Sequence, residues 1–249
     1  VAKEDFNIFR FLAKTLLSNN NNEPFYYFEN GYGTLVESYQ EKIKSLGGTI
    51  VTKSTISEFE MDKNVVKKCI INDKAYDVDK VVWTASPYFL CQLLKLEAPS
   101  LEYMNSKFVY FLLRRCKKDF QTCYYPDPNI MFNRAAIFSN HSKSIIHNKE
   151  VSDVLGVEYT FKTMEEMKKN PEEQIKQAIK DMISVGIIDD ESAIVSNTEV
   201  CVPNSYPKMG LDYKEKYKAL ENMLKPFPNI ITFGRQATFN YDNSDIVIN

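Results

Sequence analysis

The organisation of this chain is set by one stretch near its C-terminal end, residues 231–248, which read ITFGRQATFNYDNSDIVI. A short apolar run, Ile230 to Phe233, predicts a buried strand that stops at Gly234, where a backbone without a Cβ can pass close to a ligand. Arg235 follows at once, and its planar fork of donors suits a phosphate or a carboxylate. Polar residues then crowd the segment 241–245. The pattern indicates a loop that presents donors to a phosphorylated ligand, with a surface turn after an edge strand as the alternative.

A second stretch, residues 132–142, reads FNRAAIFSNHS. The segment 231–248 resembles the last flavin-contacting motif of the flavin amine oxidase and protoporphyrinogen oxidase superfamily, and it is most similar to UDP-galactopyranose mutase-like proteins. The second stretch resembles the arginine-bearing RAxIFSNxS segment of the same proteins. Two such matches in the family's order are more specific than either one alone, and weaker similarity extends over nearly the whole chain.

Composition excludes several other classes of protein. The formal net charge of −2 over 249 residues leaves no basic surface of the kind that nucleic acid requires. The sequence contains no run of eighteen apolar residues, so no membrane-spanning helix is expected. The five cysteines form no CxxC pair, which favours reduced thiols in a cytoplasmic protein, and neither histidine has a metal-ligand pattern around it, so no metal site is expected.

A dinucleotide-binding chain usually contains a strand, a G-x-G-x-x-G turn and a helix, which together hold a pyrophosphate. Nothing in this sequence matches that pattern, and Gly31-Tyr32-Gly33 is the nearest candidate. We therefore expect a fragment of a longer flavoprotein, whose missing N-terminal half would carry the Rossmann unit and act as a partner of this chain.

The expected fold class is α/β (α+β), a partial FAD-binding domain with an inserted substrate domain made of a mixed sheet and helices. The predicted parts are a leading helix and strand (1–29), a partial FAD-binding domain (30–88), a substrate-binding domain (89–206) and a return to the FAD-binding domain (207–249). Periodicity and turn residues predict helices over 2–17, 35–46, 87–94, 163–185 with a break at Pro171, and 213–224. They predict strands over 25–28, 49–53, 55–60, 65–71, 75–78, 106–116, 123–125, 130–140, 155–161 and 193–202.

The resemblance implies roles for particular residues. Arg235 would lie at the junction of flavin and sugar, as the catalytic residue. Arg134, Tyr241 and Asn243 would bind the substrate, with Arg134 on its pyrophosphate. The cofactor FAD would be contacted by Gly31, Gly33, Thr34, Ile56, Gly234, Arg235 and Asp245. Asp245 would also order its turn or cap a following helix that this chain lacks. From the residues alone, Arg134 at the edge of an apolar run fits a solvated strand-edge side chain equally well, and Ile56 fits a core strand position.

The function that the resemblance implies is FAD-dependent isomerisation of a nucleotide sugar, in which reduced flavin changes the ring size of the sugar and a nicotinamide donor first reduces the flavin. Two alternatives stay open. One is an oxidoreductase of the amine oxidase or protoporphyrinogen oxidase kind. The other is a catalytically silent binding domain that lacks half of the flavin site.

Overall fold

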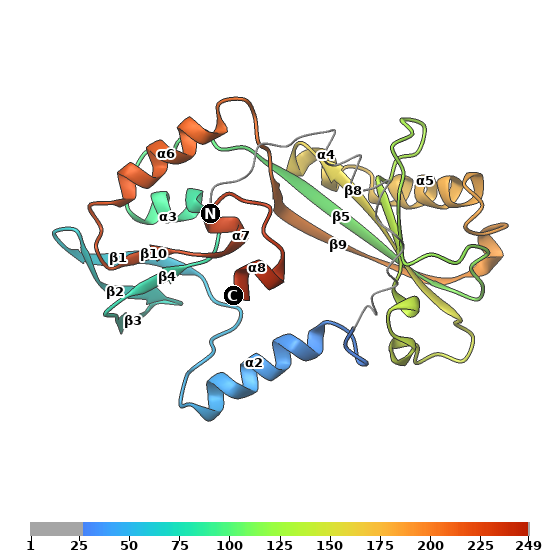
Figure 1. Cartoon of the computed structure of the whole chain (residues 1–249), viewed down its shortest axis with the longest axis horizontal. Coiled ribbons are helices and arrows are strands. Elements are labelled where there is room, and N and C mark those ends of the chain that lie inside the picture. The colour runs from blue at the N-terminus through green and yellow to red at the C-terminus, as the bar shows by residue number, and fades with distance from the viewer. Residues whose placement is uncertain (1–26, 249) are drawn as a thin grey trace, which may run out of the picture.

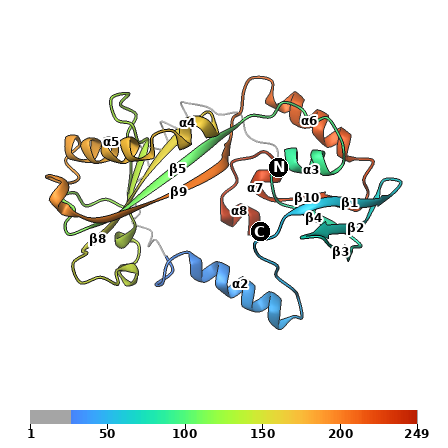
Figure 2. The same ribbon diagram turned by 180° about the vertical axis from the view of Figure 1, so that it is seen from behind.

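The computed structural model describes residues 27–248, so the helix predicted over 2–17 and the first part of the strand predicted over 25–28 lie outside the described residues. Figure 1 shows two lobes, and the long strands β5 and β9 run from one lobe towards the other. The same arrangement is seen from behind in Figure 2. None of the helices described in residues 27–248 is both long enough and apolar enough to cross a membrane.

The larger lobe is built on a five-stranded sheet in the order β6-β7-β8-β5-β9. Its strands are β5 (Tyr103–Leu113), β6 (Thr122–Tyr124), β7 (Arg134–Ile137), β8 (Asp153–Phe161) and β9 (Ile194–Pro207). All four neighbouring pairs are antiparallel, so the mixed sheet expected from the sequence is wrong in this respect. The strand predicted over 130–140 is also shorter than expected, because a 3-10 turn replaces it from Phe138 to Asn140.

One face of this sheet forms the main core. Alternate residues of β5, Val109, Phe111 and Leu113, are fully buried on that face. They belong to the same cluster as Ala178 and Met182 of helix α5 (Pro171–Ser184), which follows the short helix α4 (Met164–Lys168). Pro171 occupies the first turn of α5, where its missing N–H is tolerated, and it therefore separates the two helices as the sequence predicted.

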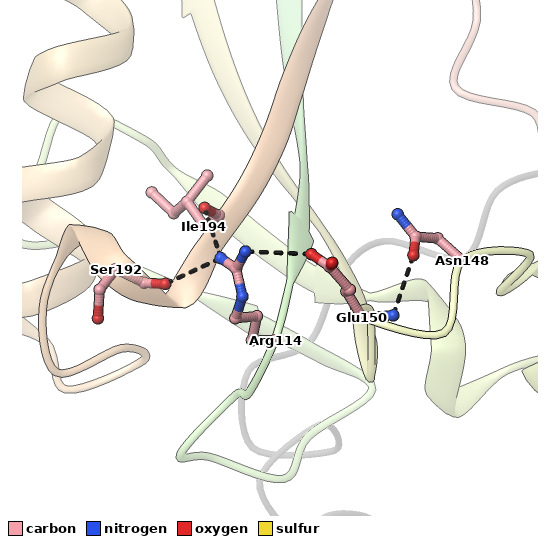
Figure 3. A network of polar contacts seen from close by, with 5 residues as sticks. All are labelled: Arg114, Asn148, Glu150, Ser192 and Ile194. Atoms are coloured by element: carbon pink, nitrogen blue, oxygen red, sulfur yellow. Dashed lines mark hydrogen bonds and ion pairs between the residues drawn. The ribbon is translucent and has the colours of Figure 1, made fainter.

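A second feature of the larger lobe is a polar network at the far end of β5 (Figure 3). Arg114 donates hydrogen bonds to the carbonyls of Ser192 and Ile194 and pairs with Glu150 at 3.2 Å. The Glu150 N–H in turn donates to the side chain of Asn148. These contacts join the end of β5 to the start of β9 and to the loop before β8.

The smaller lobe combines a three-stranded antiparallel sheet with a two-stranded parallel one. The first contains β1 (Ile56–Asp62), β2 (Val65–Ile71) and β3 (Lys74–Asp77), and the second contains β4 (Val81–Trp83) and β10 (Ile230–Thr232). Its helices are α3 (Pro87–Leu93), α6 (Tyr213–Leu224), α7 (Gly234–Ala237) and α8 (Ser244–Ile248), and α2 (Gly33–Ser45) lies apart from them (Figure 1).

Four predictions for this lobe differ from the structure. No strand forms over 49–53, since that segment finds no neighbouring strand among the described residues, and none includes residues 27–28. The strand at 230–233 is not buried, because it pairs only with β4 and leaves the side chains of Ile231 and Phe233 half exposed. The chain does contain a helix at its C-terminal end, α8, which includes Asp245.

The side chain of Asn229 links the two small sheets through hydrogen bonds. Its buried side chain accepts a hydrogen bond from the Val66 N–H at 3.1 Å and donates to the carbonyls of Val66 at 2.8 Å and Asp79 at 3.1 Å. The amide thus satisfies the main chain of β2 immediately before β10 begins. This contact fixes β10, and with it the segment 231–248, against the rest of the lobe.

We predict that Asn229→Ala lowers the free energy of unfolding by about 1–3 kcal/mol, because main-chain groups of residues 66 and 79 lose their partner. Urea unfolding followed by circular dichroism would measure the loss. Asn222→Ala on the exposed face of α6 is the matched control and should change stability by less than about 0.5 kcal/mol. Equal midpoints for the two variants would contradict the role of Asn229.

Candidate functional site

A cavity of about 670 Å³ lies where the parallel strands β4 and β10 end. Its lining includes Tyr32 before α2, Thr84 after β4, Gly234 and Arg235 of α7, and Asn243 before α8. The carboxyl ends of parallel strands are where α/β proteins usually bind ligands. Three residues predicted from the sequence, Gly234, Arg235 and Asn243, therefore share one cavity.

Gly234 is required by backbone conformation at this point. Its φ of +79° lies in the left-handed region, which side chains disfavour, whereas a Cβ built on it would make only ordinary contact with Val247 at 3.9 Å. The conformation ends β10 and starts α7, so that Arg235 follows the strand directly.

Arg235 forms no ion pair with a carboxylate among the described side chains of residues 27–244 and 246–248. Its guanidinium carbon lies 5.0 Å from the ring centroid of Tyr206 and 5.4 Å from that of Tyr241. These two rings are stacked with centroids 6.0 Å apart. The buried Nε of Arg235 has no hydrogen-bond partner. A cation held by two aromatic rings, with an unsatisfied donor, is ready to accept an anionic ligand.

Arg134 has the opposite electrostatic setting. It forms an ion pair with Glu158 of β8, whose side chain is almost fully buried. The pairing follows from the sheet register, which places Arg134 of β7 directly across from Glu158. Burial opposes the charge of Arg134, but the carboxylate of Glu158 and a hydrogen bond with Tyr124 outweigh it, so the pKa of Arg134 is raised.

Glu158 connects Arg134 to the tyrosines. One of its oxygens, Oε1, accepts hydrogen bonds from the Tyr206 hydroxyl at 2.8 Å and from the Ser106 hydroxyl at 3.3 Å, while Oε2 faces Arg134. Burial and the bond to Glu158 raise the pKa of Tyr206, which keeps this hydroxyl protonated as a donor. Arg134 and Tyr241 therefore belong to one continuous cluster, which runs from Glu158 through Tyr206.

Other predicted residues occupy different positions. The Tyr241 hydroxyl donates to the carbonyl of Pro207 at 2.6 Å. Gly31, Gly33 and Thr34 form the turn and first residues of α2, next to Tyr32 at the edge of the cavity, and a Cβ built on Gly33 would meet nothing within 4 Å. Ile56 lies at the start of β1 and lines a separate cavity of about 410 Å³ with Trp83 and Phe89. Asp245 lies in α8. The roles of all these residues stay predictions.

Sequence reasoning did not identify Glu158 or Tyr206. Glu158 stands in the strand sequence VLGVEYTF, and a charged residue inside such an apolar run was the signal available for it. Tyr206 had no comparable signal, because the sequence prediction ended that strand at residue 202, before the position of Tyr206. Among the described residues, no group of histidine, cysteine, aspartate and glutamate side chains could hold a metal ion.

We predict that replacement by methionine lowers stability more at Arg134 than at Arg235. Arg134→Met removes the cation from buried Glu158, and with allowance for the partial exposure of Arg134 it should cost about 1–3 kcal/mol of unfolding free energy. Arg235→Met removes an unsatisfied donor and a cation–π contact, and should change stability by less than about 1 kcal/mol. Chemical denaturation of both variants is the measurement, and equal losses would contradict this description.

Comparison with known proteins rests on structure. No protein-family model matches the chain, and no curated protein sequence is significantly similar to it. The structure of reduced UDP-galactopyranose mutase superimposes with a TM-score of 0.69 at 17% identity, covering 85% of this chain and 47% of that one. A protein described as a protoporphyrinogen oxidase from Exiguobacterium gives a TM-score of 0.67 at 12% identity, with coverages of 84% and 47%.

An oxidoreductase from Methanosarcina mazei gives a TM-score of 0.56 at 10% identity and covers 88% of this chain and 53% of its own. The chain thus spans about half the length of the solved structures that it matches. These likenesses confirm the α/β class expected from the sequence, and they show that the chain shares its fold with reduced UDP-galactopyranose mutase and with the other two solved structures.

Proposed function

We propose that this chain forms the substrate-binding part, and one side of the FAD site, of a sugar-nucleotide mutase that changes the ring size of a UDP-sugar. One observation carries the proposal: the uncompensated Arg235 faces the cavity at the ends of β4 and β10, and it is joined through Tyr206 and Glu158 to a second arginine, Arg134. Two arginines in one cluster suit a ligand with more than one anionic group.

The residues of the cavity fit FAD. Arg235 offers an unsatisfied buried donor, Gly234 and Asn243 line the cavity, and open space lies above Gly33 at the start of α2. These residues, with Thr34, Gly31 and Asp245 close in sequence, would hold the cofactor, and Ile56 would contact its adenine end. When bound and reduced by a nicotinamide donor, the flavin supplies the nucleophile for the exchange at the sugar.

The chain's own residues would manage the charge of the departing nucleotide. Negative charge builds on a diphosphate as its bond to the sugar breaks, and donors already in place stabilise that charge best. Arg134 has further N–H donors besides those that face Glu158 and Tyr124, and its side chain is one third exposed. Tyr241 would contribute its hydroxyl as a second contact by exchanging the carbonyl of Pro207, to which it donates in this structure, for a phosphate oxygen, and Asn243 would contribute its amide.

The smaller lobe supports a further part of the proposal, namely that another polypeptide segment completes the FAD site. Parallel sheets normally have both faces covered. Here Val82, Ile231 and Phe233 are about half exposed, and α2 buries none of its residues. A Rossmann unit supplied by another polypeptide segment would cover these surfaces, so we expect this chain alone to bind FAD weakly.

An oxidoreductase is the second candidate, and one feature favours it. Phe108, Tyr110 and Phe138 place aromatic rings on the same side of the sheet as Arg134, with centroids 6.3 and 5.7 Å apart, and could line an apolar substrate cavity. Bound FAD in its oxidised form would there supply the two-electron acceptor for oxidation of a C–N or C–C single bond to a double bond. A binding domain without catalysis is the third candidate, which the uncompensated Arg235 fits equally well.

The decisive experiment supplies the full-length protein with reduced FAD and UDP-galactopyranose. A mutase would form the galactofuranose isomer without consuming oxygen, which chromatography and an oxygen electrode would measure together. Oxygen consumption with an amine or porphyrinogen substrate, and no ring interconversion, would favour the oxidoreductase instead. Absence of both activities would leave the binding domain.

We also predict that Arg134→Ala weakens binding of UDP by roughly ten- to 150-fold, since a charge-assisted contact contributes ~1.5–3 kcal/mol. Isothermal titration calorimetry would measure the affinity. Arg114→Ala removes an arginine of the same sheet whose donors are occupied at the far end of β5, and it should leave UDP affinity unchanged. Unchanged affinity in Arg134→Ala would contradict the substrate role of that residue.

A further inference from the structure

Glu158 is buried in the middle of β8, at 3% exposure, on the side of the sheet that carries Arg134. It has three partners from three different strands: Arg134 of β7, Ser106 of β5 and Tyr206 of β9. Glu158 contacts both Arg134 and Tyr206, and the ring of Tyr206 in turn lies beside Arg235.

Stability alone does not account for a carboxylate at this position. Burying an ion pair removes two charges from water, and apolar residues of similar size often stabilise a fold equally well. What a carboxylate adds is direction, because its two oxygens accept from donors along fixed lines. Oε1 accepts hydrogen bonds from the two hydroxyls, and Oε2 pairs with the guanidinium. The orientation of the Arg134 donors relative to the ring of Tyr206 is therefore fixed.

We propose that Glu158 is a positioning residue for the diphosphate of the substrate, an inference that rests on the proposed function. It touches neither flavin nor sugar in this role. It orients the remaining donors of Arg134 towards the ligand and holds Tyr206 under Arg235, so that both arginines face the same ligand.

The direction in which UDP affinity changes, when Glu158 is neutralised, distinguishes a positioning role from a purely electrostatic one. Glu158 lowers the positive potential beside Arg134, so electrostatics alone predicts tighter binding of an anion once the carboxylate is neutralised. Positioning predicts weaker binding, because Arg134 and Tyr206 lose their common acceptor. In Glu158→Gln one of the two acceptor oxygens becomes an NH2 donor, so the side chain can no longer accept from Arg134 and from the two hydroxyls at the same time.

A matched control lies on the other side of the same sheet. Lys107 is fully buried and pairs with Glu199 of β9 at 3.1 Å. Strand alternation places Lys107 on the face of Val109, away from Ser106 and Glu158. Glu199→Gln therefore also leaves a cation in this sheet without its carboxylate, but far from the cluster around Glu158.

The experiment measures UDP affinity by titration calorimetry on the 249-residue chain and its variants. We expect Glu158→Gln to bind UDP about tenfold more weakly than the unchanged chain, and Glu199→Gln to bind it equally well despite lower stability. In an Arg134→Ala background, Glu158→Gln should cause no more than about a twofold further loss, because its effect passes through Arg134. Should Glu158→Gln fail to fold, Glu158→Asp keeps the charge but is one methylene shorter, and it should also weaken binding.

The outcomes are separable. If the unchanged chain does not bind UDP, the proposed function fails and the inference fails with it. If the unchanged chain binds UDP while Glu158→Gln or the folded Glu158→Asp binds as tightly or more tightly, only the positioning role is overturned. A tenfold loss in Glu199→Gln would also overturn it, since the effect would then be a general consequence of a weakened sheet.

Discussion

Three side-chain donors cross between the segment 235–241 and the adjoining ends of β5 and β9, and each of them ends on a main-chain carbonyl. The Tyr103 hydroxyl donates to Gln236, the Gln236 amide donates to Ser205, and the Tyr241 hydroxyl donates to Pro207. Burial raises the pKa of Tyr103 to about 12, so its hydroxyl stays a donor under ordinary conditions. Because carbonyls of regular strands cannot move independently, these bonds fix α7 against the larger lobe. The relative position of Arg235 and Arg134, which lie on different lobes, depends on this contact.

Local patterns predicted most of the elements correctly. The hairpin of β2 and β3, the helix that begins at Pro87 and the break at Pro171 all follow from short-range signals, namely turn residues and the fixed φ of proline. The failures concern partners that are distant in sequence. Residues 49–53 have the composition of a strand but no described strand to pair with, and the pairing direction of the five-stranded sheet is set by its connections and not by any local run.

The candidate site, like the fold, was predicted from the sequence only in part. Resemblance led to Arg134, Gly234, Arg235 and Tyr241, which lie in two connected places, the cavity and the cluster around Glu158. It did not lead to Glu158 or Tyr206, since their importance comes from the sheet register that sets Glu158 opposite Arg134 and from the length of β9, which extends to residue 207. Neither the register nor that extension can be read from composition or spacing. Ile56, in contrast, was assigned to the same cofactor as Gly234 but lines a different cavity.

The two arginines differ in a way that bears on how a ligand would be held. Arg134 is already paired with a carboxylate, so an anion that reaches it gains little from net charge and much from the direction of the remaining donors. Arg235 lies beside two aromatic rings and forms no ion pair among the described side chains, so an anion there is attracted by its net positive charge. A cluster with one compensated and one uncompensated cation attracts an anion mainly at Arg235 and orients it mainly at Arg134. These two different roles suit a reaction in which a diphosphate must leave the sugar, stay bound, and return to the sugar from the same direction. A site with two unpaired cations would hold the anion in several orientations.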